Sequence, residues 1–181
     1  MTAPRIQPVS EPSAEVLELY AKAGVGKGGP VLNIFGTLAH HPALLKRWLV
    51  FANHVLGKSS LSPRDRELLI LRVGVRCRSR YEFGQHVLIA KRSDITDAEI
   101  EQVKAGPDHP AWSDFDRALI RAADELHDDS RISDATWETL SARYSTEQML
   151  DAVFAVGQYH LVSFVLNSAG VELDPGVPDA L

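Results

Sequence analysis

The segment LSPRDRELLILR, residues 61–72, contains both the signal that starts a helix and the apolar run that buries one. Ser62 can cap a helix through its hydroxyl oxygen, Pro63 suits the first helical position, and Asp65 supplies an acid in the first turn. The uninterrupted apolar run 68–71 follows directly. A helix that is apolar on most sides belongs in a core. The pattern therefore predicts a buried helix that begins near Pro63.

The same start signals recur along the chain, with helical periodicity between them. Residues 96–99 (TDAE) and 145–148 (STEQ) resemble the capping boxes of two further helices. No stretch alternates polar and apolar residues, and no Asn-Gly or Asp-Gly turn is present. We therefore expect an all-α bundle of about seven or eight helices. The prolines in residues 1–12 predict an extended N-terminal arm, followed by a single helical domain over residues 13–181.

Composition and charge restrict the function. At 181 residues the chain fits one domain with a core of its own. Its 19 Lys and Arg against 24 Asp and Glu give a net charge of -5, which argues against nucleic-acid binding. Apolar runs such as 68–71 are much shorter than the roughly 20 residues of a membrane span, and the N-terminus lacks the apolar stretch of a signal peptide. We expect a cytoplasmic protein with no nucleic-acid or membrane partner.

The last predicted helix, which runs from residue 145 to about Asn167, is apolar nearly all round. Such a helix lies either at the centre of a core or at a subunit interface. In so small a bundle the subunit interface is as plausible a location for this helix as the core, so we expect a homo-oligomer.

Glu82 and His86 are candidate acid–base residues. Their spacing of four places both side chains on one face of a helix, within reach of each other. Burial raises the pKa of a carboxylic acid and a neighbouring negative charge raises that of an imidazole, which brings both toward neutral pH, where general acid–base catalysis works best. The competing interpretation is an exposed pair that stabilises the helix by roughly 0.2–0.5 kcal/mol.

Glu67 and Cys77 are further candidates, each with a structural alternative. Glu67 precedes the apolar run, where the helix dipole also favours a first-turn acid. Cys77, the single cysteine, lies within the arginine-rich segment 76–80, whose charges would lower the pKa of a thiol. On one straight helix it would lie about 180° from His86, so the alternative is a small structural thiol. A single cysteine excludes a disulfide or a dithiol couple within one chain.

No sequence motif points to a metal ion or a cofactor. Neither His40-His41 nor His109 has a further ligand at metal-binding spacing, and His-Glu-x-x-His and Cys-x-x-Cys motifs are missing. The glycine-rich segment 24–29 follows a predicted helix instead of a strand, which does not fit a dinucleotide-binding loop. We expect neither a metal ion nor an organic cofactor. Tyr159 and His160 could line a cavity, although packing is the plainer explanation.

Three stretches of the chain, residues 61–72, 81–90 and 95–100, resemble the carboxymuconolactone decarboxylase and alkylhydroperoxidase D superfamily. Residues 134–137 (DATW) and 157–160 (GQYH) are similar to a longer subfamily. The resemblance implies an all-helical bundle that assembles into trimers or hexamers, with active sites near the subunit contacts.

The peroxidase branch of that superfamily carries Glu, eleven residues, and then Cys-x-x-Cys-x-x-x-His. Counted from Glu67, the two cysteine positions hold Ser79 and Glu82, while the histidine position holds His86. Cys77 is two positions too early to replace either cysteine. A thiol peroxidase needs one thiolate to attack the peroxide and a second thiol to resolve the product. The resemblance therefore favours the decarboxylase-like branch, which works without a cofactor.

On this resemblance the protein is expected to be a carbon–carbon lyase or isomerase that acts on a small oxygenated acid, lactone or carbonyl compound, as in the degradation of aromatic compounds. Glu82 and His86 would act as acid and base, and Glu67 would orient His86.

Substrate contacts are expected from Tyr81, Tyr159 and an arginine, Arg72 or Arg80, that binds a carboxylate. Two alternatives stay open: a thiol peroxidase that uses Cys77 with an external reductant, and a helical oligomer without catalytic activity.

Overall fold

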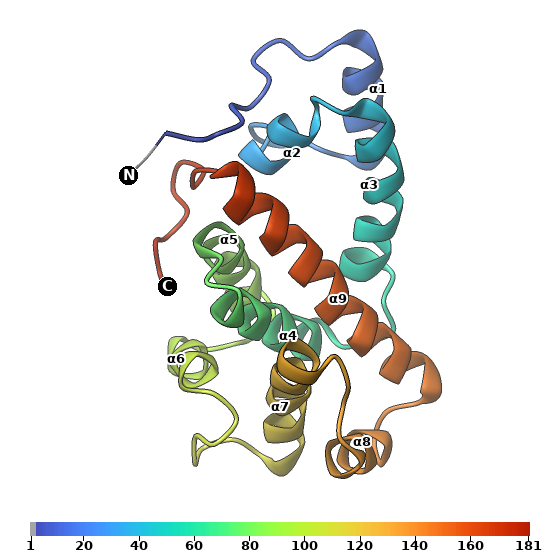
Figure 1. Cartoon of the computed structure of the whole chain (residues 1–181), viewed down its shortest axis with the longest axis vertical. Coiled ribbons are helices and arrows are strands. Elements are labelled where there is room, and N and C mark those ends of the chain that lie inside the picture. Colours follow the sequence, from blue (N-terminus) through green and yellow to red (C-terminus); the bar gives the residue numbers. More distant parts are fainter. Residues whose placement is uncertain (1–2) are drawn as a thin grey trace.

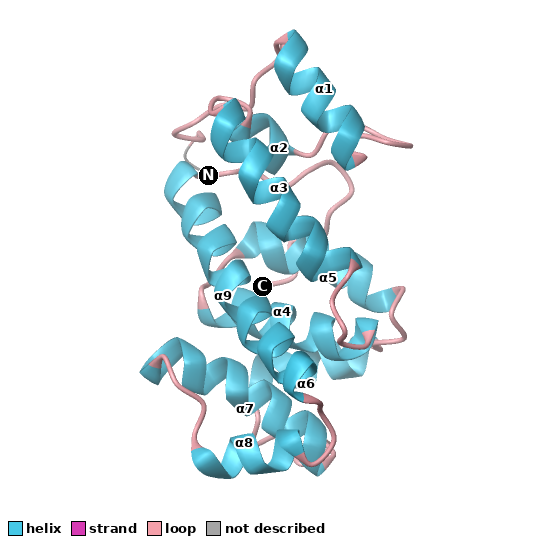
Figure 2. Ribbon diagram, turned by 90° about the vertical axis from the view of Figure 1, so that its right-hand side faces the viewer, coloured by secondary structure: helices cyan, strands magenta, loops and turns pink. Residues whose placement is uncertain are grey.

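The computed structural model describes residues 3–181, and this range folds into nine α-helices without a β-strand (Figure 1; Figure 2). The helices are α1 (Ala14–Ala23), α2 (Asn33–Leu38), α3 (Pro42–Gly57), α4 (Pro63–Arg76), α5 (Arg80–Lys91), α6 (Asp97–Ala105), α7 (Asp114–Asp129), α8 (Asp134–Ser141) and α9 (Thr146–Ala169). The all-α prediction is confirmed. The described residues form nine helices instead of the expected seven or eight, and the shortest of them, α2, has six residues.

Helix α4 lies at the centre of the bundle. The Ser62 hydroxyl accepts a hydrogen bond from the Asp65 N–H at 3.0 Å and Pro63 occupies the first turn, as the sequence predicts. Residues 67–71 have no exposed surface. Helix α4 contacts α5, α6, α7 and α9, so any polar side chain along its buried faces needs a partner on one of these helices.

Helix α9 crosses the molecule diagonally in Figure 1 and packs against α3, α4, α5, α7 and α8. By length and composition it could cross a membrane, but half of its most apolar stretch is buried inside the bundle, as in the core helix of a globular protein. Its other face leaves several large apolar side chains exposed: Leu150, Phe154, Leu161 and Phe164. The helix therefore belongs to the core on one face only.

A sharp turn joins α4 to α5. Cys77 caps the end of α4, Arg78 has a left-handed backbone with φ of 50°, and the Ser79 N–H donates to the Gly74 carbonyl at 2.9 Å. Gly74 also permits close packing, because a Cβ at this position would lie 3.3 Å from Cβ of Phe83. The turn and the close packing hold α5 alongside α4.

Both ends of the chain pack against the helices. The Arg5 N–H donates to the Ala169 carbonyl at 2.8 Å, and residues 3–12 contain no regular element. The segment that follows α9 runs along α5, where a Cβ on Gly84 would lie only 2.5 Å from the Pro178 carbonyl oxygen. Close packing at Gly84 therefore fixes the C-terminal segment.

Gly84→Ala is expected to destabilise the protein by about 1–3 kcal/mol, because the new methyl group would overlap the Pro178 backbone. Gly57→Ala is the matched control, since an added Cβ at this end of α3 has nothing within 4 Å. That substitution should leave the free energy of unfolding unchanged or raise it by up to about 1 kcal/mol. Urea unfolding compares the two, and equal stabilities would contradict the close packing at Gly84.

Candidate active site

A hydrogen-bonded carboxylate and imidazole between two helices form the centre of the candidate site. Glu67 on α4 has no exposed surface, and its Oε2 lies 2.6 Å from Nδ1 of His86 on α5. Its Oε1 accepts a hydrogen bond from Arg66 Nε at 3.0 Å. Burial alone would raise the pKa of Glu67, but the charges and hydrogen bonds of His86 and Arg66 outweigh it and lower that pKa below its usual value. Glu67 is therefore an ionised carboxylate at neutral pH.

The bond to Glu67 decides which nitrogen of His86 is available for chemistry. An ionised carboxylate only accepts hydrogen bonds, so Nδ1 carries the proton and donates it. No protein group within residues 3–181 hydrogen-bonds to Nε2, and the imidazole lines a cavity. In its neutral form His86 therefore presents the lone pair of Nε2 as a base.

Glu82 on α5 has a different environment from Glu67. Its side chain is buried, and Oε2 accepts a hydrogen bond from the Ser163 hydroxyl on α9 at 2.5 Å. Its Oε1 is buried without a partner in the described residues. Burial raises the pKa of Glu82 well above its usual value, and the Ser163 hydrogen bond opposes this only in part. Glu82 is therefore suited to hold its proton at neutral pH.

The i, i+4 spacing predicts contact between Glu82 and His86, but each residue has its hydrogen bond elsewhere. His86 pairs with Glu67 across the α4–α5 interface, and Glu82 pairs with Ser163 on α9. Both side chains nevertheless line the same cavity. The predicted pair is thus replaced by a Glu67–His86 pair with Glu82 as a separate acid.

Tyr159 and Gln158 on α9 complete the polar wall. The Tyr159 ring meets the His86 ring edge to face, with centroids 4.8 Å apart. Burial, with the nearby charges of Glu67 and Glu82, raises the pKa of the Tyr159 phenol well above its usual value. Gln158 Oε1 is buried without a partner among the described residues.

The cavity beside these residues measures about 480 Å³, within the usual range of roughly 300–1,000 Å³ for small-molecule sites. Helices α5 and α9 supply its polar wall with Glu82, His86 and Tyr159. Helix α3 supplies apolar side chains, among them Trp48, and the glycine-rich segment 24–29 closes another side. The site can therefore enclose a small and largely apolar molecule beside a base and an acid.

A family model described as the carboxymuconolactone decarboxylase family matches residues 42–125, the range that contains Glu67, Glu82 and His86. Solved structures of AhpD-like proteins share the fold of nearly the whole chain. Residues 42–125 thus match the carboxymuconolactone decarboxylase family, and the whole chain shares the fold of AhpD-like proteins. No curated protein matched the sequence.

Two AhpD-like structures cover nearly all of the chain. An uncharacterised peroxidase-related protein from a Silicibacter species is 17% identical, with a TM-score of 0.82 over 98% of this chain and 97% of that one. An alkylhydroperoxidase AhpD core protein from Ralstonia eutropha, also described as an uncharacterised peroxidase-related protein, is 20% identical, with a TM-score of 0.78 over 96% and 95%.

A debrominase in complex with 2,3,4-tribromopyrrole is 10% identical, with a TM-score of 0.74 over 94% of this chain and 91% of that one. Identities this low show a common fold only.

Within this superfamily fold, two predicted substrate contacts have structural roles instead. Arg72 is buried away from the cavity, with Nε and Nη2 on Asp124 at 2.6 and 2.7 Å and Nη1 on backbone carbonyls. It holds α4 to α6 and α7, so the prediction that Arg72 binds substrate is wrong. The alternative, Arg80, forms an exposed pair with Asp179.

Tyr81 lines the cavity, but its hydroxyl donates to Asp174 and accepts the Ile34 N–H at 3.3 Å. Because its hydroxyl is occupied at the junction of α2, α5 and the C-terminal segment, Tyr81 offers a substrate only its ring. The expected polar contact is therefore not available.

Cys77 lies outside the cavity, at the turn between α4 and α5. Burial and the nearby Glu82 raise the pKa of its thiol, outweighing the opposite effects of Ser163 and Arg76. The arginines beside Cys77, which suggested a lowered thiol pKa, have a smaller effect than burial. This environment does not favour the reactive thiolate that a peroxidase would require.

Ser163, Gln158 and the glycine-rich segment also belong to the site, although none of them was predicted to do so. Gln158 lies in the GQYH stretch that carries part of the resemblance, which could have singled it out. Ser163 has no sequence signal, because it lies 81 residues from Glu82 and meets it only through packing of α9 on α5.

Glu82→Gln is expected to stabilise the protein progressively as the pH rises. A carboxyl group with a raised folded-state pKa contributes stability below its unfolded pKa of about 4.3 and loses it as the pH rises toward the folded-state pKa. Relative to the wild type, the variant should therefore gain up to about 1.4 kcal/mol per pH unit within that window. Urea unfolding between pH 4 and pH 8 measures the difference, and a constant difference would contradict a protonated Glu82.

Proposed function

We propose that the protein is a cofactor-independent lyase or isomerase of the decarboxylase-like branch, acting on a small oxygenated acid, lactone or carbonyl compound. The observation that carries the proposal is the 2.6 Å bond between Glu67 and His86 at the wall of a cavity of about 480 Å³. It prepares a histidine base in the same way that a buried carboxylate orients the histidine of a catalytic triad.

In the proposed reaction, Nε2 of His86 removes a proton from the carbon next to a carbonyl group. Ionised Glu67 stabilises the imidazolium that forms, because the positive charge develops 2.6 Å from a buried carboxylate. The electron pair moves to the carbonyl oxygen, which accepts a hydrogen bond from protonated Glu82 or from the Tyr159 hydroxyl. Return of the proton to a second carbon gives isomerisation. In a substrate that carries a carboxylate on the same carbon, CO2 leaves instead of the proton, the C–C bonding pair moves to the carbonyl oxygen, and the carbon then takes a proton from solvent.

Opposite environments support different roles for the two carboxyl groups. Pairing keeps Glu67 charged, and burial without a cationic partner keeps Glu82 neutral. Two carboxyl groups whose pKa values are pushed apart in one site are a common way to supply an acid and a base together.

The cavity lining supports a substrate that is small, partly apolar and at most weakly anionic. Among the described residues that line it, Lys27 is the single Lys or Arg, and it lies in the glycine-rich segment. Lys27 replaces Arg72 as the candidate partner of a substrate carboxylate.

The protein is expected to act in the cytoplasm without an organic cofactor.

His86→Gln is expected to lower turnover by about 10²–10⁴-fold, the usual contribution of a positioned acid–base group. The assay follows CO2 release or loss of carbonyl absorbance with a panel of small keto acids and lactones. His54→Gln is the matched control, since His54 is exposed and lies outside the cavity. Unchanged turnover in His86→Gln would overturn the proposal, as would a wild-type protein that consumes only peroxides.

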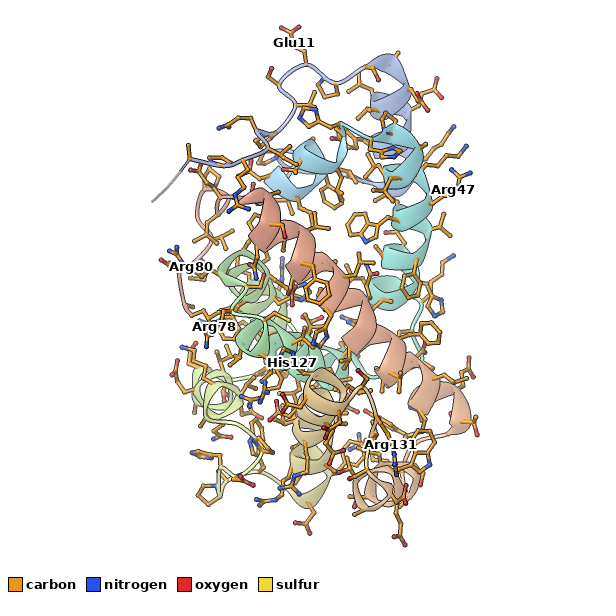
Figure 3. The ribbon with its side chains drawn as sticks, in the orientation of Figure 1. Glu11, Arg47, Arg78, Arg80, His127 and Arg131 are labelled. Carbon is orange, nitrogen blue, oxygen red and sulfur yellow. The ribbon has the colours of Figure 1, made fainter. Side chains whose placement is uncertain are left out.

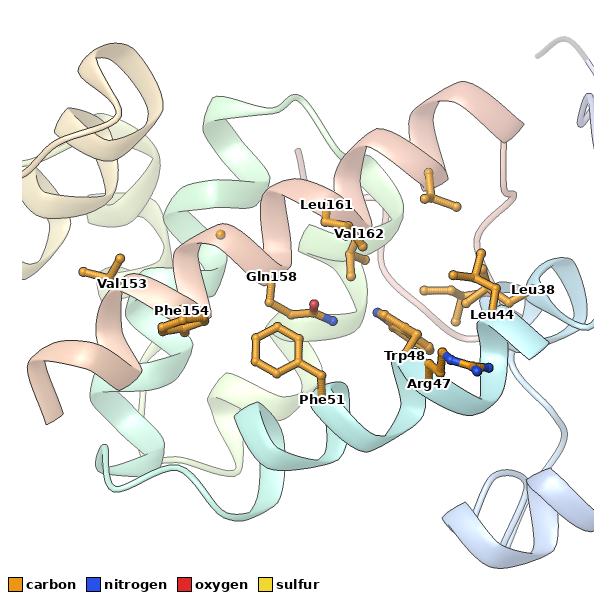
Figure 4. A pocket seen from close by; sticks show the side chains of 13 residues that line it. Leu38, Leu44, Arg47, Trp48, Phe51, Val153, Phe154, Gln158, Leu161 and Val162 are labelled. Carbon is orange, nitrogen blue, oxygen red and sulfur yellow. The ribbon is translucent and has the colours of Figure 1, made fainter. Parts of the chain in front are cut away.

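We also propose that copies of this chain associate through α3 and α9. A groove of about 620 Å³ runs between these helices and is lined almost entirely by apolar side chains (Figure 4). Phe154 and Leu161 are about half exposed at its edge, at 56% and 48%, and Phe164 continues the apolar face along α9. A continuous apolar face of this kind is typical of a subunit interface, and the resemblance implies trimers or hexamers.

Phe154→Asp is expected to convert the oligomer to a monomer, because a carboxylate would be buried without a partner in the apolar contact. Leu17→Asp is the control at a similarly exposed position on α1, outside the groove. Light scattering coupled to size-exclusion chromatography gives the mass of each. A monomeric wild type would contradict the proposed interface.

A further inference from the structure

Three side chains with metal-binding atoms meet outside the cavity. Cys77 at the end of α4, His127 on α7 and His160 on α9 each place one donor atom within 4.8 Å of the other two. All three are half-buried, and Figure 3 shows His127 near the middle of the molecule. None of them lines the cavity beside His86. Because 50 and 33 residues separate the three in sequence, no motif spacing could reveal the cluster.

Hydrogen bonds around the two imidazoles direct a protonated nitrogen of His127 at the lone pair of a His160 nitrogen. His160 Nδ1 lies 2.8 Å from the Val156 carbonyl, which only accepts, so this nitrogen carries the proton. Its Nε2 is therefore unprotonated and accepts a hydrogen bond from His127 Nδ1 at 2.8 Å. An imidazole held through its second nitrogen by a backbone carbonyl is the usual arrangement of a metal-binding histidine.

The charges around the cluster also suit a cation. Arg76, which directly precedes Cys77, has its guanidinium bound to Asp128 at 2.5 Å and lies 3.7 Å from Asp124. Two carboxylates therefore balance its charge and hold it toward α7.

We propose that Cys77, His127 and His160 bind one Zn²⁺ ion, with water as the fourth ligand. One thiolate and two imidazoles match the ligand preference of zinc over magnesium or calcium. Zinc–nitrogen bonds of about 2.0–2.1 Å place two ligand nitrogens roughly 3.3 Å apart in a tetrahedron, so the histidines need to separate by only about half an ångström.

Binding changes the protons in a defined way. The Cys77 thiol loses its proton to solvent, and the His127 proton moves from Nδ1 to Nε2, so that each zinc ion releases one proton overall. The ion would join α4, α7 and α9, and it would stabilise the folded protein by linkage. This site is independent of the proposed reaction at His86.

Cobalt substitution tests the site, because Cys77 is the single cysteine and any thiolate-to-cobalt charge-transfer absorption must come from it. Chelator-treated full-length protein is titrated with Co²⁺ and then with Zn²⁺. The expected result is one Co²⁺ per chain with that absorption, its loss on addition of Zn²⁺, and a higher melting temperature with Zn²⁺.

Variants separate the three-residue site from other metal binding. Cys77→Ser should abolish the absorption, and His127→Gln or His160→Gln should weaken Co²⁺ binding at least tenfold. His54→Gln, an exposed histidine elsewhere, should leave it unchanged. Circular dichroism confirms that each variant is folded, and the two histidine variants suffice if Cys77→Ser is not. No absorption, half an ion per chain, or full binding in both histidine variants would overturn the proposal.

Discussion

A carboxylate with no exposed surface constrains everything around it, and in this protein that carboxylate is Glu67. Leaving such a charge unpaired costs about 3–5 kcal/mol, so a partner has to reach it inside the core. His86 is that partner, and it lies on a different helix. The tight turn after α4 and the close contact at Gly74 are the features that bring α5 near enough.

The same packing gives the site its chemical asymmetry. Glu67 has a cation and an imidazole as partners, whereas Glu82 faces only the Ser163 hydroxyl on α9. One carboxyl group is therefore held as an anion and the other as an acid, although both belong to adjacent helices of one core. The His86 imidazole is oriented by its hydrogen bond to Glu67. It makes no hydrogen bond to Glu82, although both side chains line the same cavity.

Much of the fold could be predicted from the sequence, because its signals are local. The Ser62 cap, the capping box at residues 96–99 and the apolar run of α4 all lie within a few residues of the structure they specify. Only the total differs, since residues 3–181 form nine helices instead of the expected seven or eight.

The site was predictable only in part, because its contacts join distant residues. The four-residue spacing placed Glu82 and His86 on one helix but gave no sign that Glu67 bonds the imidazole; only the family resemblance pointed to Glu67 as the residue that orients His86. Arg72 appeared suited to a substrate because of its charge, and only the fold shows that Asp124 already occupies it. The neighbouring arginines predict a lowered pKa for the Cys77 thiol, but burial outweighs their effect and raises that pKa.

The most direct test of the account is proton and nitrogen NMR of the His86 side chain, with His86→Gln used for assignment. The account predicts a protonated Nδ1 with a strongly downfield proton resonance, as expected for a short bond to a carboxylate, and an unprotonated Nε2 in the neutral ring. In Glu67→Gln this resonance should move upfield or disappear, while Glu82→Gln should leave it in place. An imidazole protonated at Nε2 instead, or a resonance insensitive to Glu67, would contradict the central claim.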